Sequence, residues 1–391
     1  MALPPSRILV VDDVAENRDL LIRRLKRMQL TDTVEAGDGR EALARIREDS
    51  FDLVLLDVMM PEMSGIEVLR ALREEGRLAD MPVVMISAAS EIEKVVECIE
   101  LGAEDYLPKP FNPALLAARV RAALERRHLR TENRRQFERM TGELERARIL
   151  QLRMMPDHAD FDPARWDIAG RMEPALEIGG DLYDLFEVRP GMLCVAIGDV
   201  AGKGMPAGLF MARARSLLRA GLLQHVALAG APPRPSQIAG LLNSELCKNN
   251  PDTTFVTLFV GLLDLETGRL DFCNAGHVYP LRISASRGAE EIVTPADPAL
   301  GVVEDFPFAD HDMVIEPGET LLLATDGLGD TQNPAGEALE NERILSLAAT
   351  LSGAQASEAL EGLTDAARLF ADGAPPFDDV TMVAIRRIGG G

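Results

Sequence analysis

Residues 7–13 read RILVVDD and residues 51–57 read FDLVLLD, and each is a short apolar run that ends in aspartate. Three more strand-like segments follow the same plan: TDTVEA at 31–36, MPVVMIS at 81–87 and DYLP at 105–108. Helical spacing occupies the stretches between and after them, at 16–28, 39–47, 65–73, 91–101 and 112–124. Strict alternation of strand and helix predicts a doubly wound α/β domain with a five-stranded parallel sheet.

Reactive side chains stand at the carboxyl ends of these predicted strands. Asp12 and Asp13 end the first strand, Asp57 the third and Ser87 the fourth, and Lys109 follows the fifth. In doubly wound sheets the chemistry lies beyond this edge. The five residues therefore predict a chemically reactive site at this edge of the sheet.

With these residues in order, and PKP at 108–110, the segment resembles the receiver domain of bacterial two-component response regulators, a flavodoxin-like fold. The resemblance implies that Asp57 accepts a phosphoryl group from a histidine kinase. It implies Mg²⁺ held by Asp13, Asp57 and the carbonyl of Met59, with Asp12 acting through water. Lys109 and Ser87 would contact the phosphate, Tyr106 would change rotamer with it, and the Lys109–Pro110 bond would be cis.

A second group of aspartates lies where apolar runs meet a glycine or a turn. They are Asp181 in EIGGDLYD, Asp199 in LCVAIGDVAGKG, Asp326 in LLLATDGLGD and Asp378 in FDDVTMVAIRR. One such residue is usually a turn residue. Four from separate segments are expected to converge at the edge of neighbouring strands, where they repel unless a cation neutralises them. Oxygen ligands without a Cys or His motif predict Mg²⁺ or Mn²⁺, commonly as two ions sharing a carboxylate.

The second half of the chain is mostly strand-like. Strand patterns occur at 166–173, 191–199, 253–264, 268–276, 319–326 and 380–388, and helical patterns at 207–223, 235–247 and 340–370. Strands with helices inserted between them predict an α+β domain in which helices flank an antiparallel β-sandwich.

Six motifs in this half, EIGGD, GDVAGKG, CNAGH, PGE, ATDG and DDVT, resemble those of the SpoIIE-like branch of the PPM-type, metal-dependent protein serine/threonine phosphatases. The resemblance implies that Asp199 bridges two Mg²⁺ or Mn²⁺ ions and that the metals activate a water to attack phosphorus. Asp181 and the carbonyl of Val200 would bind one ion, and Asp326 and Asp378 the other. Asp379 follows Asp378, and the sequence leaves open which of the two points inward.

Two further residues of these motifs have two interpretations each. Lys203 either touches the substrate phosphate or is a solvated lysine in a glycine turn. His277 either donates a proton or binds phosphate, or it makes a structural hydrogen bond. The motifs also depart from the branch in DGLGDTQN at 326–333 and in VYP after NAGH. These departures bear on substrate positioning and leave the proposed metal ligands intact.

A charged helical stretch separates the two halves and carries a partial heptad pattern. The predicted domains are accordingly 1–124, a linker at 125–160, and 161–388. A dimeric signalling helix is favoured over a monomeric surface helix, which predicts a homodimer. Apolar seam positions are Leu116, Ala123, Phe137, Met140, Leu144, Ala147 and Met154, interrupted by Arg119, Arg126, Arg130, Asn133 and Gln151.

Composition limits the remaining classes of function. The chain has 391 residues and a formal net charge of −22, which opposes binding to nucleic acid or to an anionic membrane. No apolar run approaches the roughly 20 residues of a membrane span, and the start lacks a signal-peptide pattern, so a cytoplasmic location is expected. The four cysteines lie apart in apolar contexts and are expected to be reduced thiols.

Three functions are compatible with the sequence. The favoured one is a response regulator whose output dephosphorylates a partner protein, with an anti-anti-sigma factor as the expected substrate and with the sign of control left open. In the second, the output domain binds its partner without turnover; such degenerate domains lack metal carboxylates, whereas all four are present here. The third is a receiver-linked diguanylate cyclase, whose only support is GGD at 179–181.

Overall fold

The computed structural model describes residues 5–88, 92–156 and 164–388. The chain forms two compact units, Met1–Thr141 and Gly142–Gly391. The expected helix start at Glu91, the linker end at residue 160 and the domain start at residue 161 lie outside the described residues.

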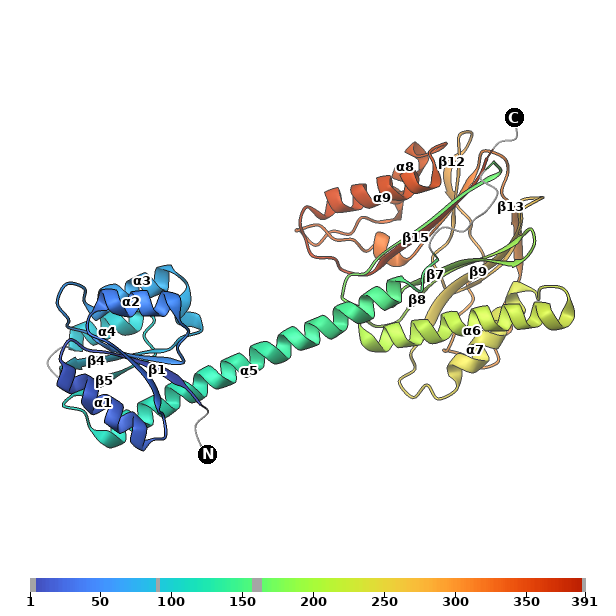
Figure 1. The fold of residues 1–391 in the computed structure, drawn as a ribbon. Coiled ribbons are helices and arrows are strands. Elements are labelled where there is room, and N and C mark those ends of the chain that lie inside the picture. The colour runs from blue at the N-terminus through green and yellow to red at the C-terminus, as the bar shows by residue number, and fades with distance from the viewer. Residues whose placement is uncertain (1–4, 89–91, 157–163, 389–391) are drawn as a thin grey trace. The chain divides into compact units, whose positions relative to one another are not determined.

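The first unit contains the predicted five-stranded sheet, and its order is β2-β1-β3-β4-β5 (Figure 1). Each neighbouring pair is parallel, which confirms the doubly wound fold. The Lys109–Pro110 peptide bond is cis, as expected. The elements are β1 (Arg7–Val11), α1 (Ala15–Arg27), β2 (Asp32–Ala36), α2 (Gly39–Glu48), β3 (Leu53–Asp57), α3 (Gly65–Glu74), η1 (Arg77–Ala79), β4 (Val83–Ala88), α4 (Ile92–Leu101), β5 (Asp105–Lys109) and α5 (Pro113–Leu152).

The sheet is covered on both faces, and alternate residues of β1 show how. Leu9 and Val11 belong to a core shared with α2 and α3. Ile8 and Val10 belong to a second core shared with α1 and α5. Because successive side chains of a strand point to opposite faces, a strand buried on both sides has to be apolar throughout. This explains why RILVV is a continuous apolar run.

Helix α5 joins the predicted helix at 112–124 to the predicted helical linker without a break, and it reaches Leu152 in the second unit. The start of the predicted seam is not available to a second chain, because Leu116 and Ala123 are buried in the core of the first unit. At the other end, Met154 packs against the core of the second unit. Phe137 and Met140, by contrast, are 73% and 63% exposed. Any dimer seam is therefore shorter than predicted, and the homodimer itself stays a prediction.

The second unit contains two five-stranded antiparallel sheets, which confirms the predicted sandwich. Their orders are β13-β10-β9-β8-β7 and β12-β11-β14-β15-β6. The elements are β6 (Trp166–Glu173), β7 (Leu182–Arg189), β8 (Met192–Val200), α6 (Met205–Ala229), α7 (Pro235–Cys247), β9 (Val256–Asp264), β10 (Arg269–Ala275), β11 (Leu281–Ser284), β12 (Gly288–Glu291), β13 (His311–Val314), β14 (Thr320–Ala324), η2 (Asp326–Leu328), α8 (Asn341–Thr350), α9 (Ala356–Ala371) and β15 (Val380–Arg387).

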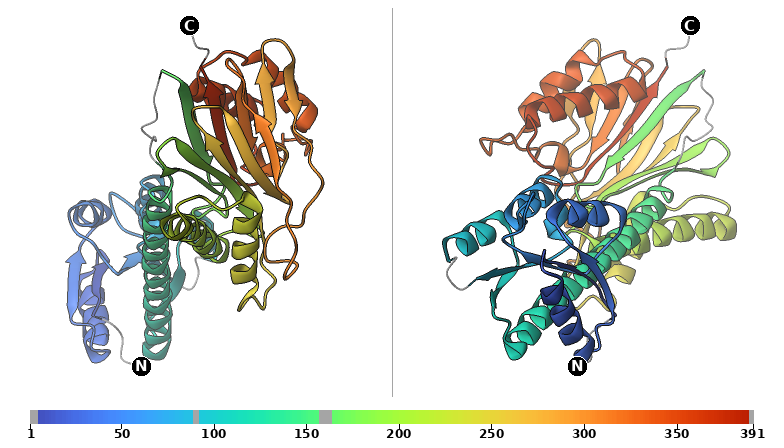
Figure 2. Two further views of the ribbon diagram at one scale, coloured as in Figure 1. Left: turned by 90° about the vertical axis from the view of Figure 1, so that its right-hand side faces the viewer. Right: turned by 60° about the vertical axis from the view of Figure 1, so that its left-hand side comes forward.

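Alternation along β14 shows how the layers of this unit are built. Leu321 and Leu323 join the core that both sheets share with α6 and α7. Leu322 between them points the other way and packs with residues of α8 and α9. Figures 1 and 2 show α8 and α9 over the outer face of one sheet and α6 and α7 over that of the other. The two sheets thus lie between two helical layers.

Two details of this unit differ from the expectations. The helical pattern at 340–370 is two helices: α8 ends at Thr350, and the chain turns through Gly353, whose φ is +85°, before α9 begins at Ala356. Four strands were not among those identified from the sequence: β7, directly after Asp181, and the short strands β11, β12 and β13. None of the four cysteines, all of which lie within the described residues, is part of a disulfide. No helix in the described part of the chain is long and apolar enough to cross a membrane.

Candidate active sites

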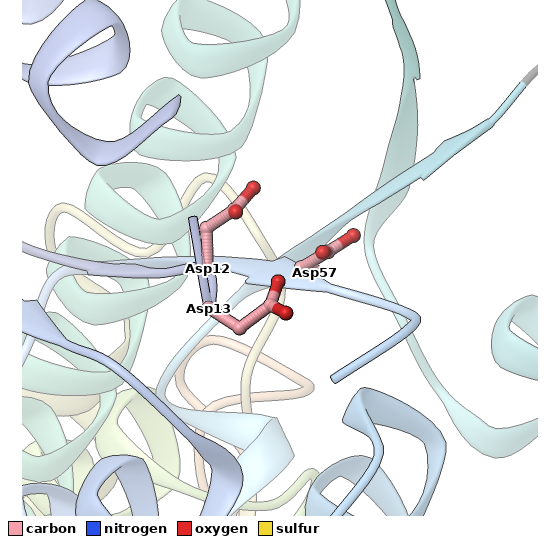
Figure 3. A group of neighbouring side chains, drawn as sticks. All are labelled: Asp12, Asp13 and Asp57. Atoms are coloured by element: carbon pink, nitrogen blue, oxygen red, sulfur yellow. The ribbon is translucent and has the colours of Figure 1, made fainter. Parts of the chain in front are cut away.

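The first site lies at the carboxyl edge of the parallel sheet. Asp12, Asp13 and Asp57 each offer a carboxylate oxygen within 4.8 Å of the others. Figure 3 shows the three side chains gathered at the ends of β1 and β3. Asp12 and Asp57 are buried and Asp13 is exposed. Three oxygen donors at this spacing suit a small divalent cation such as Mg²⁺, so the residues fit the expected ion.

Lys109 supplies positive charge to this site. Its Nζ lies 2.8 Å from an oxygen of Asp12 and 2.8 Å from an oxygen of Asp57. Burial raises the pKa of the Asp57 carboxyl, and the hydrogen bond from Lys109 opposes this effect. Burial acts to lower the pKa of Lys109, but its hydrogen bonds to the two carboxylates outweigh that effect and the pKa is raised. Lys109 is therefore a permanent cation beside Asp57.

The remaining residues predicted for this site surround the acidic group. Ser87 is buried and pairs with Pro108 in the β4–β5 register, next to Lys109. Met59 follows Asp57 by two residues and is exposed, as is the side chain of Tyr106. Five of the predicted residues thus lie at one end of the sheet, namely Asp12, Asp13, Asp57, Ser87 and Lys109. Met59 is in the loop that follows β3, and Tyr106 pairs with Met85 further back along β4 and β5.

In the second unit, Asp181 and Asp199 come from different elements and interact. Asp181 is the residue before β7 and is buried, and its Oδ2 accepts a 2.8 Å hydrogen bond from the Thr325 hydroxyl. Asp199 is the penultimate residue of β8 and pairs with Thr257 of β9. Burial and the charge of Asp199 hold the pKa of Asp181 well above its usual value. The two carboxylates are thus close enough to repel each other.

Asp326 and Asp378 complete the predicted group. Asp326 opens the short helix η2 after β14, and Asp378 lies two residues before β15. Burial raises the pKa of Asp326, with further contributions from the charges of Asp330 and Asp378. Burial and the charge of Asp326 raise the pKa of Asp199 to about 7. All four aspartates therefore belong to one electrostatic cluster.

Asp378 and Asp379 have different partners, which distinguishes the two positions that the sequence left open. Asp379 is buried, and its carboxylate accepts hydrogen bonds from the backbone N–H groups of Ala175 (2.7 Å) and Gly180 (2.6 Å). The carboxylate of Asp378 instead pairs with Lys203 at 3.0 Å. Asp379 therefore holds the loop before Asp181 in place through these hydrogen bonds, and Asp378 is the more accessible carboxylate.

Two glycines allow the segments to approach this closely. A Cβ on Gly180 would lie 2.9 Å from the carbonyl oxygen of Val200, and one on Gly327 would lie 1.9 Å from the carbonyl oxygen of Asp379. Neither position can carry a side chain without displacing backbone. The carbonyl of Val200 therefore lies directly against the turn that carries Asp181.

The donor set of this second group fits divalent cations, since it consists of carboxylate oxygens whose mutual repulsion a cation would relieve. The spacing, however, differs from that of the first site. Across residues 5–88, 92–156 and 164–388, the Asp12, Asp13 and Asp57 group alone brings three ligand atoms within 4.8 Å of one another. The four aspartates of the second unit are too widely spaced for one ion to take all of them, so they fit a site divided between ions.

Lys203 and His277 occupy very different environments. Lys203 is half-exposed, pairs with Asp378, donates to the carbonyl oxygen of Phe377 and lies 4.8 Å from the centre of its ring. His277 is buried, and its Nδ1 lies 2.9 Å from the Thr257 hydroxyl. Burial lowers the pKa of His277 to about 4. Lys203 is thus placed beside the acidic cluster, while His277 contacts Thr257, the residue that pairs with Asp199.

Several residues around the cluster were not identified from the sequence. Thr325 and Thr381 are both in the quoted motifs, and the Thr381 N–H donates to the Thr325 hydroxyl oxygen (3.0 Å), which directs the Thr325 proton to Asp181. Asp330 lies within DGLGD. Gln151, which the sequence marks only as a defect in the heptad, bonds to the turn before Asp181. Their contacts depend on the tertiary fold, so residue type and spacing carry no signal for them.

Comparison with known proteins identifies both units. The family model of stage II sporulation protein E (SpoIIE) matches residues 189–388, which is 200 of the 391 residues, and that of the response regulator receiver domain matches residues 8–121. The protein IcfG of Synechocystis is 31% identical over 268 residues, covering 63% of this chain and 41% of IcfG. The transcriptional regulatory protein CpxR of Escherichia coli is 48% identical over 124 residues, covering 32% of this chain and 51% of CpxR.

The chain thus spans about half the length of the curated relatives it matches. Among solved structures, the SiaA-PP2C domain of Pseudomonas aeruginosa superposes with a TM-score of 0.55 at 20% identity, covering 64% of this chain and 97% of that domain. This likeness shows the fold of the second unit, a PP2C-type phosphatase fold. In that fold the GGD turn leads into an antiparallel sandwich, which removes the support for a diguanylate cyclase.

Proposed function

We propose that this chain, which belongs to the SpoIIE family and also contains a response-regulator receiver domain, hydrolyses phosphoserine or phosphothreonine on a partner protein under the control of Asp57. The observation that carries the proposal is the cluster of Asp181, Asp199, Asp326 and Asp378. Four separate segments of a phosphatase fold bring these carboxylates together, and burial and the neighbouring carboxylate charges raise the pKa of Asp181, Asp199 and Asp326. The proposed domains are the receiver at 1–124, the helical linker at 125–160 and the phosphatase domain at 161–388.

In the output domain we assign metal binding to the chain's own oxygen donors. Asp199 would be shared between two Mg²⁺ or Mn²⁺ ions, Asp181 and the Val200 carbonyl would hold one, and Asp326 and Asp378 the other. Bound ions would supply an activated water and positive charge for the phosphoryl oxygens. Asp379 and Thr325 would orient the turn and the carboxylate of Asp181 through the hydrogen bonds described above.

In the receiver we assign phosphoryl acceptance to Asp57 and charge neutralisation to Lys109, which already contacts it at 2.8 Å. Asp13, Asp57 and the Met59 carbonyl would hold Mg²⁺, with Asp12 acting through water. Ser87 would hydrogen-bond the phosphoryl group, and Tyr106 would change rotamer with it. A histidine kinase would be the phosphodonor. The two units communicate through α5, which runs through both.

The substrate we propose is a small phosphorylated regulator of the anti-anti-sigma class, carried over from the family. The homodimer we propose forms through the exposed apolar residues of α5, with Phe137 and Met140 at its centre. A purely binding role has less support than an enzymatic one, because none of the four carboxylates expected of an active enzyme is replaced.

One experiment tests the core of this proposal. The purified chain is assayed for hydrolysis of p-nitrophenyl phosphate in Mn²⁺, with and without acetyl phosphate as donor for Asp57. We expect metal-dependent turnover that changes in the presence of the donor. Absence of turnover in both states would contradict the phosphatase proposal and favour a binding role; turnover that ignores the donor would contradict control by the receiver.

A further inference from the structure

Gln151 lies in the last turn of α5 and makes an unusual pair of contacts. Its side chain is buried, with only 6% of the residue exposed. The side-chain Nε2 donates to the carbonyl oxygen of Gly179 at 2.6 Å, and the Gly179 N–H donates to Oε1 at 3.1 Å. One amide side chain thus satisfies both polar groups of one residue of the main chain.

The contacted residue belongs to the turn that carries Asp181. Gly179 precedes Asp181 by two residues, and Gly180 between them donates to Asp379. The turn is therefore held on one side by Asp379, from the loop before β15, and on the other by Gln151, from α5. Both contacts are buried, so the loss of either would leave buried polar groups without a hydrogen-bond partner. The position of the turn therefore depends on both contacts.

The heptad pattern supports a role within the chain. Gln151 occupies a seam position of the predicted coiled coil, where a polar residue would weaken pairing with a second chain. In the structure it faces Gly179 of its own chain, and the neighbouring Met155 is buried in the core of the same unit. The polar residue at this seam position is explained by a contact to the phosphatase unit.

We infer that Gln151 is a positioning residue, which sets the place of Asp181 through Gly179 and so makes metal binding depend on where α5 ends. This inference rests on the proposed function, because Asp181 matters only as a metal ligand. A shift or rotation of the end of α5 moves the amide, and the amide carries the turn with it. Residues behind a ligand typically change metal affinity by about 10- to 100-fold when replaced.

The test measures Mn²⁺ binding to the full chain by electron paramagnetic resonance of the free ion, together with turnover as a function of Mn²⁺. Gln151→Leu removes both hydrogen bonds. Gln151→Glu keeps the size and still accepts from the Gly179 N–H, but it cannot donate to the Gly179 carbonyl. The matched control is Gln136→Leu, the same replacement at an exposed position of the same helix.

We expect Gln151→Leu to bind Mn²⁺ about 10-fold more weakly, Gln151→Glu to be weakened as well, and Gln136→Leu to equal the wild type. Saturating Mn²⁺ should restore kcat of the Gln151 variants to within about 2-fold, which loss of folding would not allow. Wild-type affinity in folded Gln151 variants would overturn the inference. If neither variant folds, hydrogen exchange of wild-type residues 177–182 decides, and exchange as fast as in a free peptide would overturn it.

The proposed function can fail independently. A wild-type chain that neither binds Mn²⁺ nor hydrolyses p-nitrophenyl phosphate would contradict the phosphatase proposal. A wild type that does both, with unchanged Gln151 variants, would contradict the positioning role alone.

Discussion

The acidic sites of the two units are built in opposite ways. In the receiver, Asp12 and Asp57 end two adjacent strands of one sheet, and Lys109 at the end of another strand contacts both at 2.8 Å. In the phosphatase unit, Asp199 belongs to one sheet, while Asp326 and Asp378 flank strands of the other. Backbone pairing therefore fixes the receiver site, whereas the packing of two sheets fixes the phosphatase site.

This difference has a consequence for control. Strands in one sheet are joined by hydrogen bonds that hold their ends in register, so the receiver's three carboxylates lie within 4.8 Å of one another before any ion binds. The distances between side chains on different sheets depend on the positions of the turns and helices around them. A site of the second kind is the one that an outside element such as α5 can adjust.

The largest expected effect comes from the carboxylate that we assign to both metal ions. Asp199→Ala should lower kcat for p-nitrophenyl phosphate by at least about 10³-fold, more than the 10- to 100-fold typical of residues behind a ligand. Steady-state rates in Mn²⁺ measure it. Asp312→Ala, at an exposed position of β13, is the control and should leave the rate unchanged. Substantial hydrolysis by Asp199→Ala would rule out a shared ligand at this position.

The next largest effect concerns folding of the phosphatase unit. Asp184 of β7 is fully buried and pairs with Arg219 at 2.6 Å and Arg215 at 3.2 Å, both on α6. Asp184→Asn leaves two guanidinium groups without their counter-charge, and breaking a buried pair in this way costs about 3–5 kcal/mol. Urea denaturation of the full chain, followed by circular dichroism, measures the loss.

The control for this change is Asp365→Asn on α9, where an exposed carboxylate lies 3.6 Å from Arg368. An exposed pair of this kind contributes about 0–1 kcal/mol, so the control should unfold close to the wild-type urea concentration. Equal destabilisation by both variants would mean that the link between α6 and β7 does not depend on the buried charge.

Much of the fold was predictable because burial imposes a period on the sequence. The run RILVV predicts a strand covered on both faces, and the structure divides its residues between two cores. The prediction of one helix at 340–370 was wrong. The helical spacing continues through the break, but α8 ends at Thr350 and the chain turns through Gly353, whose φ is positive. Periodicity identifies a buried face better than it identifies where an element stops.

The candidate sites were predictable only in part for a related reason. Aspartates at strand ends are visible in the sequence, because strand ends are where a sheet gathers its polar groups. The sequence does not show whether Asp378 or Asp379 faces the cluster. Neighbouring residues of an extended chain point in opposite directions, and either choice matches the motif. Gln151 was equally invisible, since its partner Gly179 is distant in sequence and the contact exists only in the folded unit.

A smaller effect is expected from the receiver itself. Asp57→Asn removes the proposed phosphoryl acceptor, so the rate of p-nitrophenyl phosphate hydrolysis should no longer change with acetyl phosphate. Couplings between sites are typically about 1–3 kcal/mol, or 5- to 150-fold, and this is the range of response that should disappear. Asp49→Asn, at an exposed residue of the same unit, should keep the response. A response that survives in Asp57→Asn would place the acceptor elsewhere.

The smallest effect sharpens the comparison between the two lysines. Lys109 bridges two carboxylates, whereas Lys203 is 40% exposed and pairs with Asp378 alone, which is itself 31% exposed. If Lys203 only competes with a cation for Asp378, Lys203→Met should tighten Mn²⁺ binding about 2- to 5-fold, the size of an exposed ion pair. If it contacts the substrate phosphate, the KM for p-nitrophenyl phosphate should rise while the Mn²⁺ affinity stays the same.

Lys248→Met, which breaks the exposed pair with Glu245, is the control. Unchanged Mn²⁺ affinity and unchanged KM would mean that the Lys203–Asp378 contact, unlike that of Lys109, has no part in the site.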